Sequence, residues 1–484
     1  MLKDVVPFER VWLELHGSSS SARAVASFIR FLERRLGAEF IYDQAHSNYE
    51  PLELAGLLEL AETLRARGII RSYGRDPGLP DEPPLSHWYA EYKVAGSSKR
   101  AAGSTTGDQR LALAKTLAET VERNAWFTHD RFFPFYRGTV ADVEKKGGAL
   151  RPERFASYSD SQRRNIPRLA LAPTDSFFWV RGRSWTTGRL VWIPAQIVSG
   201  HEKLKAFSPS SGEPVIRASI TTGLATRPER TGALLAGALE VIERDAYIIT
   251  WLNQLSPPRL DLAVLARESE SLARLLARCR RYRLLPQVLR LPTDAPAYAV
   301  CAVLEDATGA LPRFSVGLKA DRAPALAAEG AVLEALRAHL GARKLKLSPP
   351  VTWTPETKAT DIGQYERLLY WAEGDRGDRL AFLTRGAIQP REEAEWEHDT
   401  DEEHFERIVA WCRAKNYELA SVHFADTRVG PSLWQTEFVV MPELQPLHYN
   451  EKLPYAGGER LQEIPRQFGY AAREPYLDDP HPFA

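Results

Sequence analysis

The chain of 484 residues has only three cysteines, Cys279, Cys301 and Cys412, which are far apart and form no CxxC pattern. This excludes a disulfide framework and a thiolate zinc site, so we expect all three to be core residues. An excess of charge is also missing, because 63 basic residues balance 63 acidic ones. We therefore expect no general attraction to nucleic acid or to an anionic membrane.

Long apolar runs are absent as well. None reaches the roughly 18 residues that would suggest a transmembrane helix, and residues 1–17 do not resemble a secretory signal. We expect a cytoplasmic protein with no membrane partner. No Gly-rich phosphate loop and no GxGxxG follow a predicted strand, so a bound nucleotide would need other groups to hold its phosphates.

Two unequal parts are predicted. Residues 1–66 form a small N-terminal unit, helical or α+β, with helices over 22–36 and 52–68, and it is a candidate for partner docking. Residues 67–484 mix helices and strands, which indicates an α+β fold. The hydrophobic pattern predicts helices at 111–127, 233–251, 325–345 and 405–416, and strands at 177–182, 189–198, 296–305, 314–318 and 437–444.

The predicted helix at residues 111–127 carries one pair of glutamates, Glu119 and Glu122, followed directly by Arg123. The spacing i, i+3 places both carboxylates on one helix face, where like charges repel by a few tenths of a kcal/mol. One interpretation of this helix alone is a solvated surface. The other is a binding site for a cation.

The helix at 233–251 repeats the pattern with Glu240, Glu243 and Arg244. Apolar residues cover about half of its circumference, which predicts burial on most sides and leaves the glutamates in a narrow polar wedge. Buried carboxylates need a positive partner, and Mg²⁺ is commonly held by carboxylates together with substrate phosphates. An ion-pair network with Arg123 and Arg244 is the structural alternative.

These segments resemble the YcaO family. TTGLATRPERTGALLAGALEVIERDAYIITWLNQLSPPRLDL, residues 221–262, is similar to the family signature, in which a Ser-Asn-Gly-Leu-Ala turn precedes a helix with Glu-x-x-Glu-Arg-Asp-Ala. AAGSTTGDQRLALAKTLAETVERNAW and WVRGRSWTTGRLVWIPAQIV resemble two further family segments. The terminal PHPFA is similar to the proline-rich tail of the azoline-forming cyclodehydratase branch, which makes thiazole/oxazole-modified peptides.

The resemblance implies a YcaO-type ATP-binding fold of mixed sheets and packed helices, with ATP and Mg²⁺ as cofactors. By motif position, the magnesium ligands are Glu119, Glu122, Glu240 and Glu243. The same four glutamates belong to the expected nucleotide site, which also includes Thr222, Arg244 and Glu334.

This chain departs from the family pattern at several positions. The usual Asn of the turn is Thr222, and the Ser that often stands four residues before the first glutamate is Lys115, for which we expect a solvent-exposed side chain. The third family segment, usually Glu-Ala-x-Gln-x-Arg, keeps its glutamate but has Arg337 and His339 in place of Gln and Arg. Ala484 ends the chain where family tails commonly have proline.

The implied reaction is phosphorylation of a peptide amide. A Cys, Ser or Thr side chain of the substrate attacks the preceding carbonyl, the resulting oxygen takes the γ-phosphoryl group of ATP, and loss of phosphate leaves an azoline ring. The enzyme contributes positioning and charge neutralisation. Because Pro480 and Pro482 stiffen the tail, we expect His481 and the carboxylate of Ala484 to assist proton transfer as catalytic groups.

Expected partners are a ribosomal precursor peptide and a separate E1-like or leader-recognition protein. The family also implies a flavin-dependent azoline dehydrogenase and a homodimer. The alternatives are a macroamidine- or thioamide-forming enzyme of the same family, or a catalytically impaired scaffold subunit.

Overall fold

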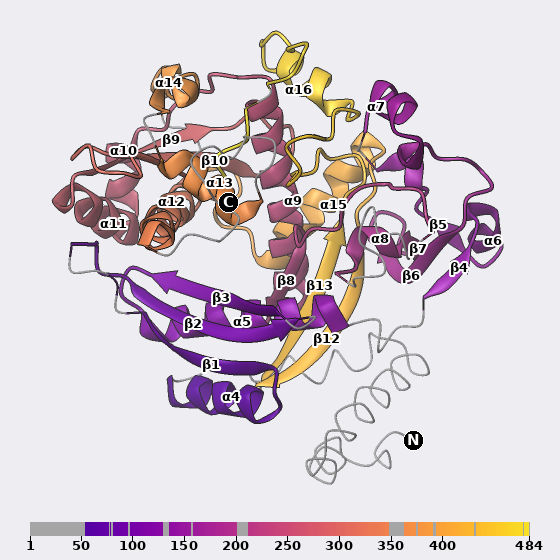
Figure 1. The fold of residues 1–484 in the computed structure, drawn as a ribbon, viewed down its shortest axis with the longest axis horizontal. Coiled ribbons are helices and arrows are strands. Elements are labelled where there is room, and N and C mark those ends of the chain that lie inside the picture. The colour runs from indigo at the N-terminus through magenta and orange to yellow at the C-terminus, as the bar shows by residue number, and fades with distance from the viewer. Residues whose placement is uncertain are drawn as a thin grey trace.

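The computed structural model shows an α+β protein in which helices pack against three sheets in the described part of the chain (Figure 1). The fold class therefore agrees with the prediction. The predicted helix at 22–36 lies outside the described residues, and the division into 1–66 and 67–484 stays a prediction. The structure describes residues 54–484 without 77, 79–80, 95–96, 129–134, 156–157, 201–211, 348–362, 374–375, 391–393, 430–431, 478 and 484.

The first sheet is antiparallel in the order β1-β2-β3. It shares a hydrophobic core with two helices, one on each side of it in sequence. In this core Gly103 is required, because a Cβ atom there would lie 2.2 Å from the carbonyl oxygen of Ala112 on the second helix. The elements are α4 (Leu54–Ala66), β1 (Ile70–Arg75), β2 (Ser86–Val94), β3 (Ser97–Thr105) and α5 (Gln109–Thr128).

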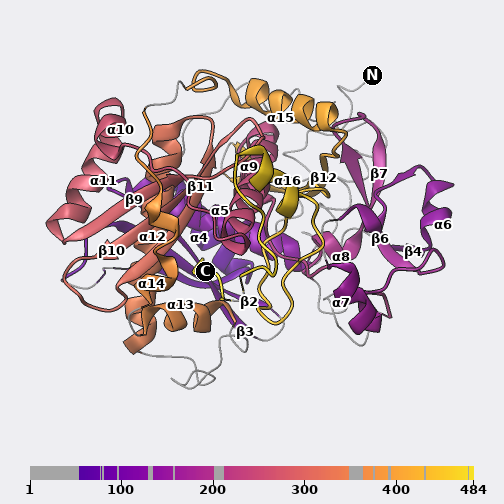
Figure 2. The same ribbon diagram turned by 90° about the horizontal axis from the view of Figure 1, so that it is seen from above.

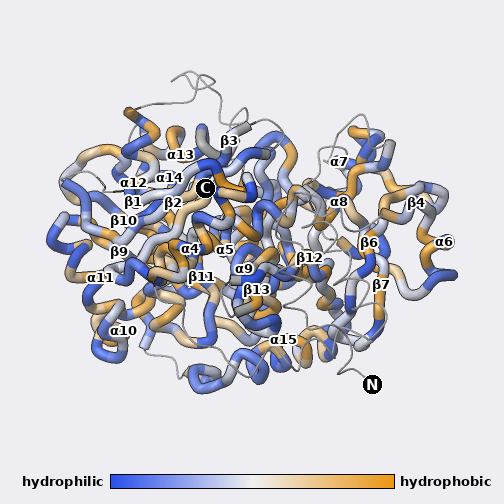
Figure 3. The backbone as a smooth tube through the Cα atoms, turned by 90° about the horizontal axis from the view of Figure 1, so that it is seen from below, coloured by the Kyte–Doolittle hydropathy of each residue, from blue (hydrophilic) through white to orange (hydrophobic). Residues whose placement is uncertain are grey.

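A second three-stranded antiparallel sheet has the order β11-β10-β9 and carries three helices. The longest helix approaches the sheet closely at Gly317, where a Cβ atom would lie 2.2 Å from the amide nitrogen of Ala335. The elements are α10 (Leu262–Glu268), α11 (Glu270–Arg281), β9 (Leu284–Arg290), β10 (Tyr298–Asp306), β11 (Phe314–Asp321) and α12 (Pro324–Leu347). Figure 3 shows hydrophilic and hydrophobic residues mixed along α11, whose apolar side is buried.

The largest sheet has the order β5-β7-β6-β12-β13-β8, with β4 paired to β6. The prediction of a strand over 189–198 is wrong in its second half: β7 ends at Pro194, which has no amide hydrogen for a ladder, and α8 follows. The elements are β4 (Tyr136–Gly138), β5 (Gly148–Ala149), β6 (Phe177–Ser184), β7 (Leu190–Pro194), α8 (Ala195–Val198), β8 (Leu224–Arg227), β12 (Ala420–Val429) and β13 (Ser432–Val440).

Helix α9 (Arg230–Leu252) lies at the centre of the molecule (Figure 2). It packs on β8 and β13 of the large sheet, on β10 and β11 of the neighbouring sheet, and on two later helices, α15 (Asp401–Lys415) and α16 (Arg460–Gln467). Most of its residues are buried, as its apolar circumference predicts. The helix therefore brings Glu240, Glu243 and Arg244 to the place where the sheets meet.

The remaining elements are short. The three cysteines are buried and unpaired, as expected, and burial raises the pKa of Cys279 to about 12. Within the described ranges, no helix combines the length and the apolar character needed to cross a bilayer. The short elements are α6 (Val140–Glu144), α7 (Asp160–Asn165), α13 (Gln364–Ala372), α14 (Gly377–Leu380) and the 3₁₀ turns Pro152–Arg154, Pro167–Leu169 and Leu383–Arg385.

Candidate functional site

Glu119 on α5 is held between a strand and its own helix. Its Oε2 accepts a hydrogen bond from the amide of Ala102 in β3 at 3.2 Å, and its Oε1 lies 3.6 Å from Nη2 of Arg123. The carboxylate is nevertheless 32% exposed, so it is oriented by the protein and still accessible to a ligand.

Glu240 on α9 repeats this arrangement. Its Oε2 accepts from the amide of Gly223 at 2.9 Å, and its Oε1 lies 3.4 Å from Nη2 of Arg244, with 31% of the side chain exposed. Gly223 has a φ of +93°, and a Cβ atom there would lie 2.1 Å from the carbonyl oxygen of Val439. Only glycine therefore allows this turn to place its amide beside the glutamate.

Two further helix glutamates of the predicted site accept hydrogen bonds from strand amides. Glu334 Oε2 on α12 accepts from Leu318 at 2.6 Å, and Glu243 Oε2 on α9 accepts from Ala320 at 2.8 Å. Glu243 is buried, and its second oxygen forms an ion pair with Arg244. It is thus more enclosed than Glu119 and Glu240.

Glu122 provides the clearest electrostatic evidence for a cation site. Its pKa is raised to about 8, mainly by desolvation and also by the nearby carboxylates of Glu240 and Glu119, while Arg123 and Arg227 oppose the shift. Glutamates from α5 and α9 therefore lie close enough to repel one another, as the two sequence pairs suggested. A divalent cation would relieve this repulsion.

Mg²⁺ binding is expected to displace a proton from Glu122. Because the pKa of about 8 keeps this carboxyl largely protonated at pH 7, Mg²⁺ affinity should rise about tenfold per pH unit up to about pH 8. Calorimetry in buffers of different ionisation enthalpy would measure the released proton. The Glu122→Gln variant should lose this pH dependence, and Glu153→Gln, at an exposed site, should keep it.

Protein stability gives a second readout of the same carboxyl. Its folded pKa lies above the ordinary 4.5, so the folded state binds more protons than the unfolded chain between about pH 4.5 and 8. Without Mg²⁺, Glu122 therefore lowers stability as pH rises through this window. At pH 9 Glu122→Gln should melt at a higher temperature than the wild type. An equal melting temperature would contradict the inference that the carboxylates of α5 and α9 repel one another.

Basic side chains adjoin these carboxylates. Lys115 on α5 is exposed, as expected, but its pKa is lowered by partial desolvation and by the nearby charges of Arg337, Lys319 and Arg227. Arg337 on α12 donates from Nη2 to the carbonyl oxygen of Ala102 at 2.9 Å. Arg337 therefore binds the same residue of β3 whose amide donates to Glu119.

An open cleft of about 460 Å³ lies beside Lys115 and Arg227. One face of α5 and the turn between β8 and α9 form its walls. Leu57, Leu111 and Trp434 supply apolar surface. The cleft thus combines apolar walls with cationic groups next to the carboxylates.

The C-terminal tail is inserted into the protein. Carbonyl oxygens of Asp479 and Pro480 accept hydrogen bonds from Trp251 Nε1 at 3.1 Å and Trp371 Nε1 at 3.2 Å. The ring centroid of Phe483 lies 4.2 Å from Cζ of Arg244, so the tail reaches the helix that carries Glu240 and Glu243. Ala484 lies outside the described residues, and the role expected of its carboxylate stays a prediction.

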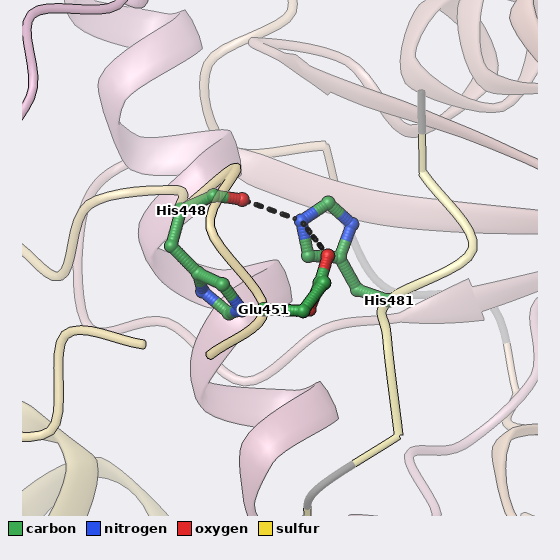
Figure 4. Close-up of side chains that lie close together, drawn as sticks. All are labelled: His448, Glu451 and His481. Atoms are coloured by element: carbon green, nitrogen blue, oxygen red, sulfur yellow. Dashed lines mark hydrogen bonds and ion pairs between the residues drawn. The ribbon is translucent and has the colours of Figure 1, made fainter. Parts of the chain in front are cut away.

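His481 is fully buried beside His448 and Glu451 (Figure 4). Its Nε2 lies 2.8 Å from the carbonyl oxygen of His448 and 3.9 Å from Glu451 Oε1, and its pKa is lowered well below the usual value by desolvation and by Arg367. Three potential metal ligands meet here. However, Glu451 already pairs with Arg367, and a hydrogen bond to a carbonyl requires the proton on Nε2, so this arrangement fastens the tail instead.

A sequence model described as "YcaO cyclodehydratase", ATP- and Mg²⁺-binding, matches residues 104–444. The chain belongs to the YcaO family. This range contains every helix glutamate described above, and the description agrees with the expected cofactors, ATP and Mg²⁺. No curated protein matches the chain by sequence.

Solved structures share the YcaO fold at low sequence identity. A "heterocyclase in complex with substrate and cofactor" superposes with a TM-score of 0.70 at 19% identity. The match covers 91% of this chain, but this chain spans only 60% of the length of that protein. YcaO from Methanopyrus kandleri bound with AMPPCP and Mg²⁺ superposes with a TM-score of 0.55 at 19% identity, and the match covers 80% of this chain and 91% of that one. A chain of the E. coli microcin synthetase McbBCD complex with pro-MccB17 bound superposes with a TM-score of 0.60 at 13% identity, and the match covers 85% of this chain and 96% of that one.

The departures from the YcaO motifs have distinct places in this fold. Thr222 lines a small pocket together with Arg244. Arg337 remains at the site through Ala102, whereas His339 is buried 3.8 Å from Asp306, where desolvation lowers its pKa to about 4. A cation is therefore retained on α12, two residues before the position at which the family usually has arginine.

Sequence reasoning missed Lys319, Arg227 and Arg217. Lys319 stands singly on a strand, Arg227 at the end of another strand and Arg217 in an irregular segment, where no helical spacing marks them. The signal that would have found Arg227 is its place directly after the Gly-Leu-Ala-Thr turn of the family signature. Nothing in the local sequence distinguishes Arg217 or Lys319.

Proposed function

We propose that the chain is an ATP-dependent peptide cyclodehydratase that converts Cys, Ser or Thr residues of a ribosomal precursor peptide into thiazoline or oxazoline rings. The observation that carries this proposal is the grouping of Glu119, Glu122 and Glu240 near Arg227, which lines the cleft together with Lys115. Carboxylates beside cations suit a magnesium nucleotide. Membership of the YcaO family and the heterocyclase neighbours support the reaction class.

The cleft would receive the adenosine part of ATP. Leu57, Leu111 and Trp434 offer apolar surface for the base, and Lys115 and Arg227 lie where the phosphates need positive charge. This arrangement would replace the Gly-rich loop that the sequence lacks.

Mg²⁺ would be held by the glutamates of α5 and α9. One oxygen of Glu119 is fixed by a strand amide and one of Glu240 by a turn amide, and the raised pKa of Glu122 reflects desolvation and nearby negative charge that a cation would offset. When bound, the ion neutralises phosphate charge. Glu243, which is more buried, would complete the magnesium ligands, and Glu334 would belong to the nucleotide site.

The protein's task in this reaction is positioning. An amide oxygen is a poor leaving group, and phosphorylation makes its departure feasible once the ring has closed. Lys115, Arg227 and Arg337 would neutralise the phosphates, and the glutamates would fix their orientation. No nucleophile of the protein is required. In the proposal, His481 and Ala484 assist proton transfer from the tail.

Delivery of the substrate by a separate E1-like or leader-recognition protein belongs to the same proposal. It is supported by a neighbour with the same fold, which is a complex of several proteins with a bound precursor. Residues 1–66 are the proposed docking unit. A flavin-dependent azoline dehydrogenase as a further partner and a homodimer rest on the family alone.

The test is mass spectrometry of the precursor peptide encoded nearest the gene. It is incubated with the protein, the neighbouring partner protein, Mg²⁺ and ATP. We expect loss of one water per ring, and no loss without ATP or without Mg²⁺. Exchange of oxygen for sulfur would indicate the thioamide branch, and water loss with a link between two chain positions would indicate a macroamidine. Nucleotide binding without any peptide product would support a scaffold.

A further inference from the structure

The region from Tyr136 to Trp192 carries an excess of positive charge that the balance of the whole chain hides. It contains 11 basic and 5 acidic residues, whereas the chain as a whole has 63 of each. Its strands β4, β6 and β7 lie at one end of the molecule (Figures 1 and 2). The proposed nucleotide and magnesium sites use none of these residues, so they do not account for the excess.

One face of the β6–β7 pair presents arginines beside apolar side chains. Cross-strand partners in an antiparallel pair project from the same face, and so do residues two positions apart on one strand. Arg181 is the partner of Trp192, and Arg183 is the partner of Leu190. Arg181 is exposed, and Leu190 is 60% exposed. The face is therefore open to solvent.

Ring contacts extend this face to β4 and to the turn after α6. Cζ of Arg181 lies 5.1 Å from the ring centroid of Trp192, and the ring centroids of Trp192 and Tyr136 are 5.6 Å apart. Nζ of Lys146 lies 5.0 Å from the ring centroid of Tyr136. Such contacts hold the cations in place. We call this surface the cation–aromatic stripe, and it consists of Lys146, Tyr136, Trp192, Arg181, Leu190 and Arg183.

The two outermost cations of the stripe are not compensated by carboxylates. Within the described ranges, the charged group of neither Lys146 nor Arg181 forms an ion pair or a hydrogen bond. Acidic side chains of α6 have other partners, because Glu144 pairs with Arg151 and Asp142 accepts from the amide of Thr139. The stripe is therefore complementary in charge to acidic groups on another molecule.

The size of the stripe favours a short peptide over a folded partner. Three strands about 4.8 Å apart and two steps of about 6.7 Å along them give roughly 130 Å². A stable protein interface needs about 800 Å² per partner. Single-stranded nucleic acid is held by bases stacked on aromatic rings, but Lys146 and Arg181 already lie against these rings. Carboxylates at alternate positions of an extended peptide have the spacing of Arg181 and Arg183.

We propose that the cation–aromatic stripe binds an acidic segment of the precursor peptide in an extended conformation. Carboxylates of this segment would contact Lys146, Arg181 and Arg183, and an apolar side chain would pack on Leu190. The identity of the peptide rests on the proposed cyclodehydratase function, because the precursor is the flexible chain that this function brings to the protein. The stripe would raise the affinity for the precursor without touching the reacting atoms.

Fluorescence anisotropy with a synthetic probe tests the binding directly. The probe is fluorescein-labelled (Glu-Ser)₅, with glutamates at alternate positions, and (Lys-Ser)₅ is its counterpart of opposite charge. We expect only the glutamate probe to bind, and Arg181→Glu to weaken its binding about tenfold at low salt. Arg164→Glu makes the same change of charge at an exposed position of α7 and should weaken binding less than about twofold.

Steady-state kinetics with the precursor, the partner protein and ATP test whether the stripe serves the substrate. Arg181→Glu should raise KM for the precursor about tenfold and leave kcat within about twofold, because a contact made equally before and during the reaction changes KM alone. Arg164→Glu should match the wild type. An unchanged melting temperature would show that Arg181→Glu is folded.

Equal weakening of the glutamate probe by Arg181→Glu and Arg164→Glu would overturn the inference, because net charge alone would then explain binding. An unchanged KM in Arg181→Glu would overturn it too. So would tighter binding of a uridine decanucleotide or of phosphatidylserine vesicles that Arg181→Glu abolishes. If the wild type processes no precursor, the proposed function fails instead. Anisotropy of the labelled precursor then decides: weaker binding to Arg181→Glu than to Arg164→Glu supports the stripe, and equal binding overturns it.

Discussion

Replacement of Glu240 by glutamine is expected to lower peptide-dependent ATP turnover by roughly 10³-fold, the scale of losing a charged group that acts on the transferring phosphoryl. Glutamine keeps an oxygen that can accept from the amide of Gly223, so the turn before β8 should remain in place. What disappears is the negative charge that the proposed Mg²⁺ needs. Release of inorganic phosphate, measured over a range of Mg²⁺ concentrations, checks this result.

Two controls separate this effect from a loss of folding. Glu229→Gln removes an exposed glutamate just before the start of the same helix and should leave turnover unchanged. The melting temperature of Glu240→Gln should stay close to that of the wild type, since its ion pair with Arg244 is partly exposed and long. If this variant kept the turnover of the wild type, ATP and Mg²⁺ would not bind at the carboxylates of α5 and α9.

The sequence was sufficient to predict the two helices that carry the glutamate pairs and the pairs themselves. Glu119 and Glu122 follow the helical period, and so do Glu240 and Glu243, so their shared faces could be inferred without knowledge of the tertiary fold. The difference between Glu240 and Glu243 could not be predicted. It depends on Ala320 in β11, which donates its amide to Glu243 and lies about 80 positions further along the chain.

The electrostatic surroundings of the site were harder to predict because they depend on long-range packing. Arg337 contacts Ala102 across more than 200 positions of sequence, and this contact explains how a cation remains although the family pattern is broken. Among the described residues Arg217 has no carboxylate partner, and its guanidinium lies 5.3 Å from the ring centroid of Phe155, a contact that only the tertiary structure reveals. Local periodicity carries no information about either contact.

The tail illustrates the same limit. Pro480 and Pro482 predicted a stiff terminus, and the structure places residues 479–483 in the core. Nothing in the local sequence indicated that His481 would face His448 and Glu451 and not the helix carboxylates. That orientation is fixed by Arg367, which is more than 100 positions away from the tail.

Loss of the Arg367 side chain is expected to destabilise the protein more than any other change considered above. Arg367 is fully buried and donates from Nε to Glu451 Oε1 at 2.8 Å, from Nη2 to the carbonyl oxygen of Tyr449 at 3.2 Å and from Nη1 to that of Phe483 at 3.5 Å. Arg367→Met leaves Glu451 buried without its cation, which costs about 3–5 kcal/mol. Urea unfolding measures this change in the free energy of unfolding.

A second ion pair of the tail provides the matched control. Arg379 pairs with Asp479 and is 48% exposed, so Arg379→Met should cost less than about 1 kcal/mol. Replacement of both Arg367 and Glu451 by methionine should recover much of the loss, because no buried charge is then left unpaired. If Arg367→Met costs no more than Arg379→Met, the buried pair does not hold the tail. If it does cost more, carboxypeptidase should also shorten the variant faster than the wild type, since residues 479–483 would leave the core.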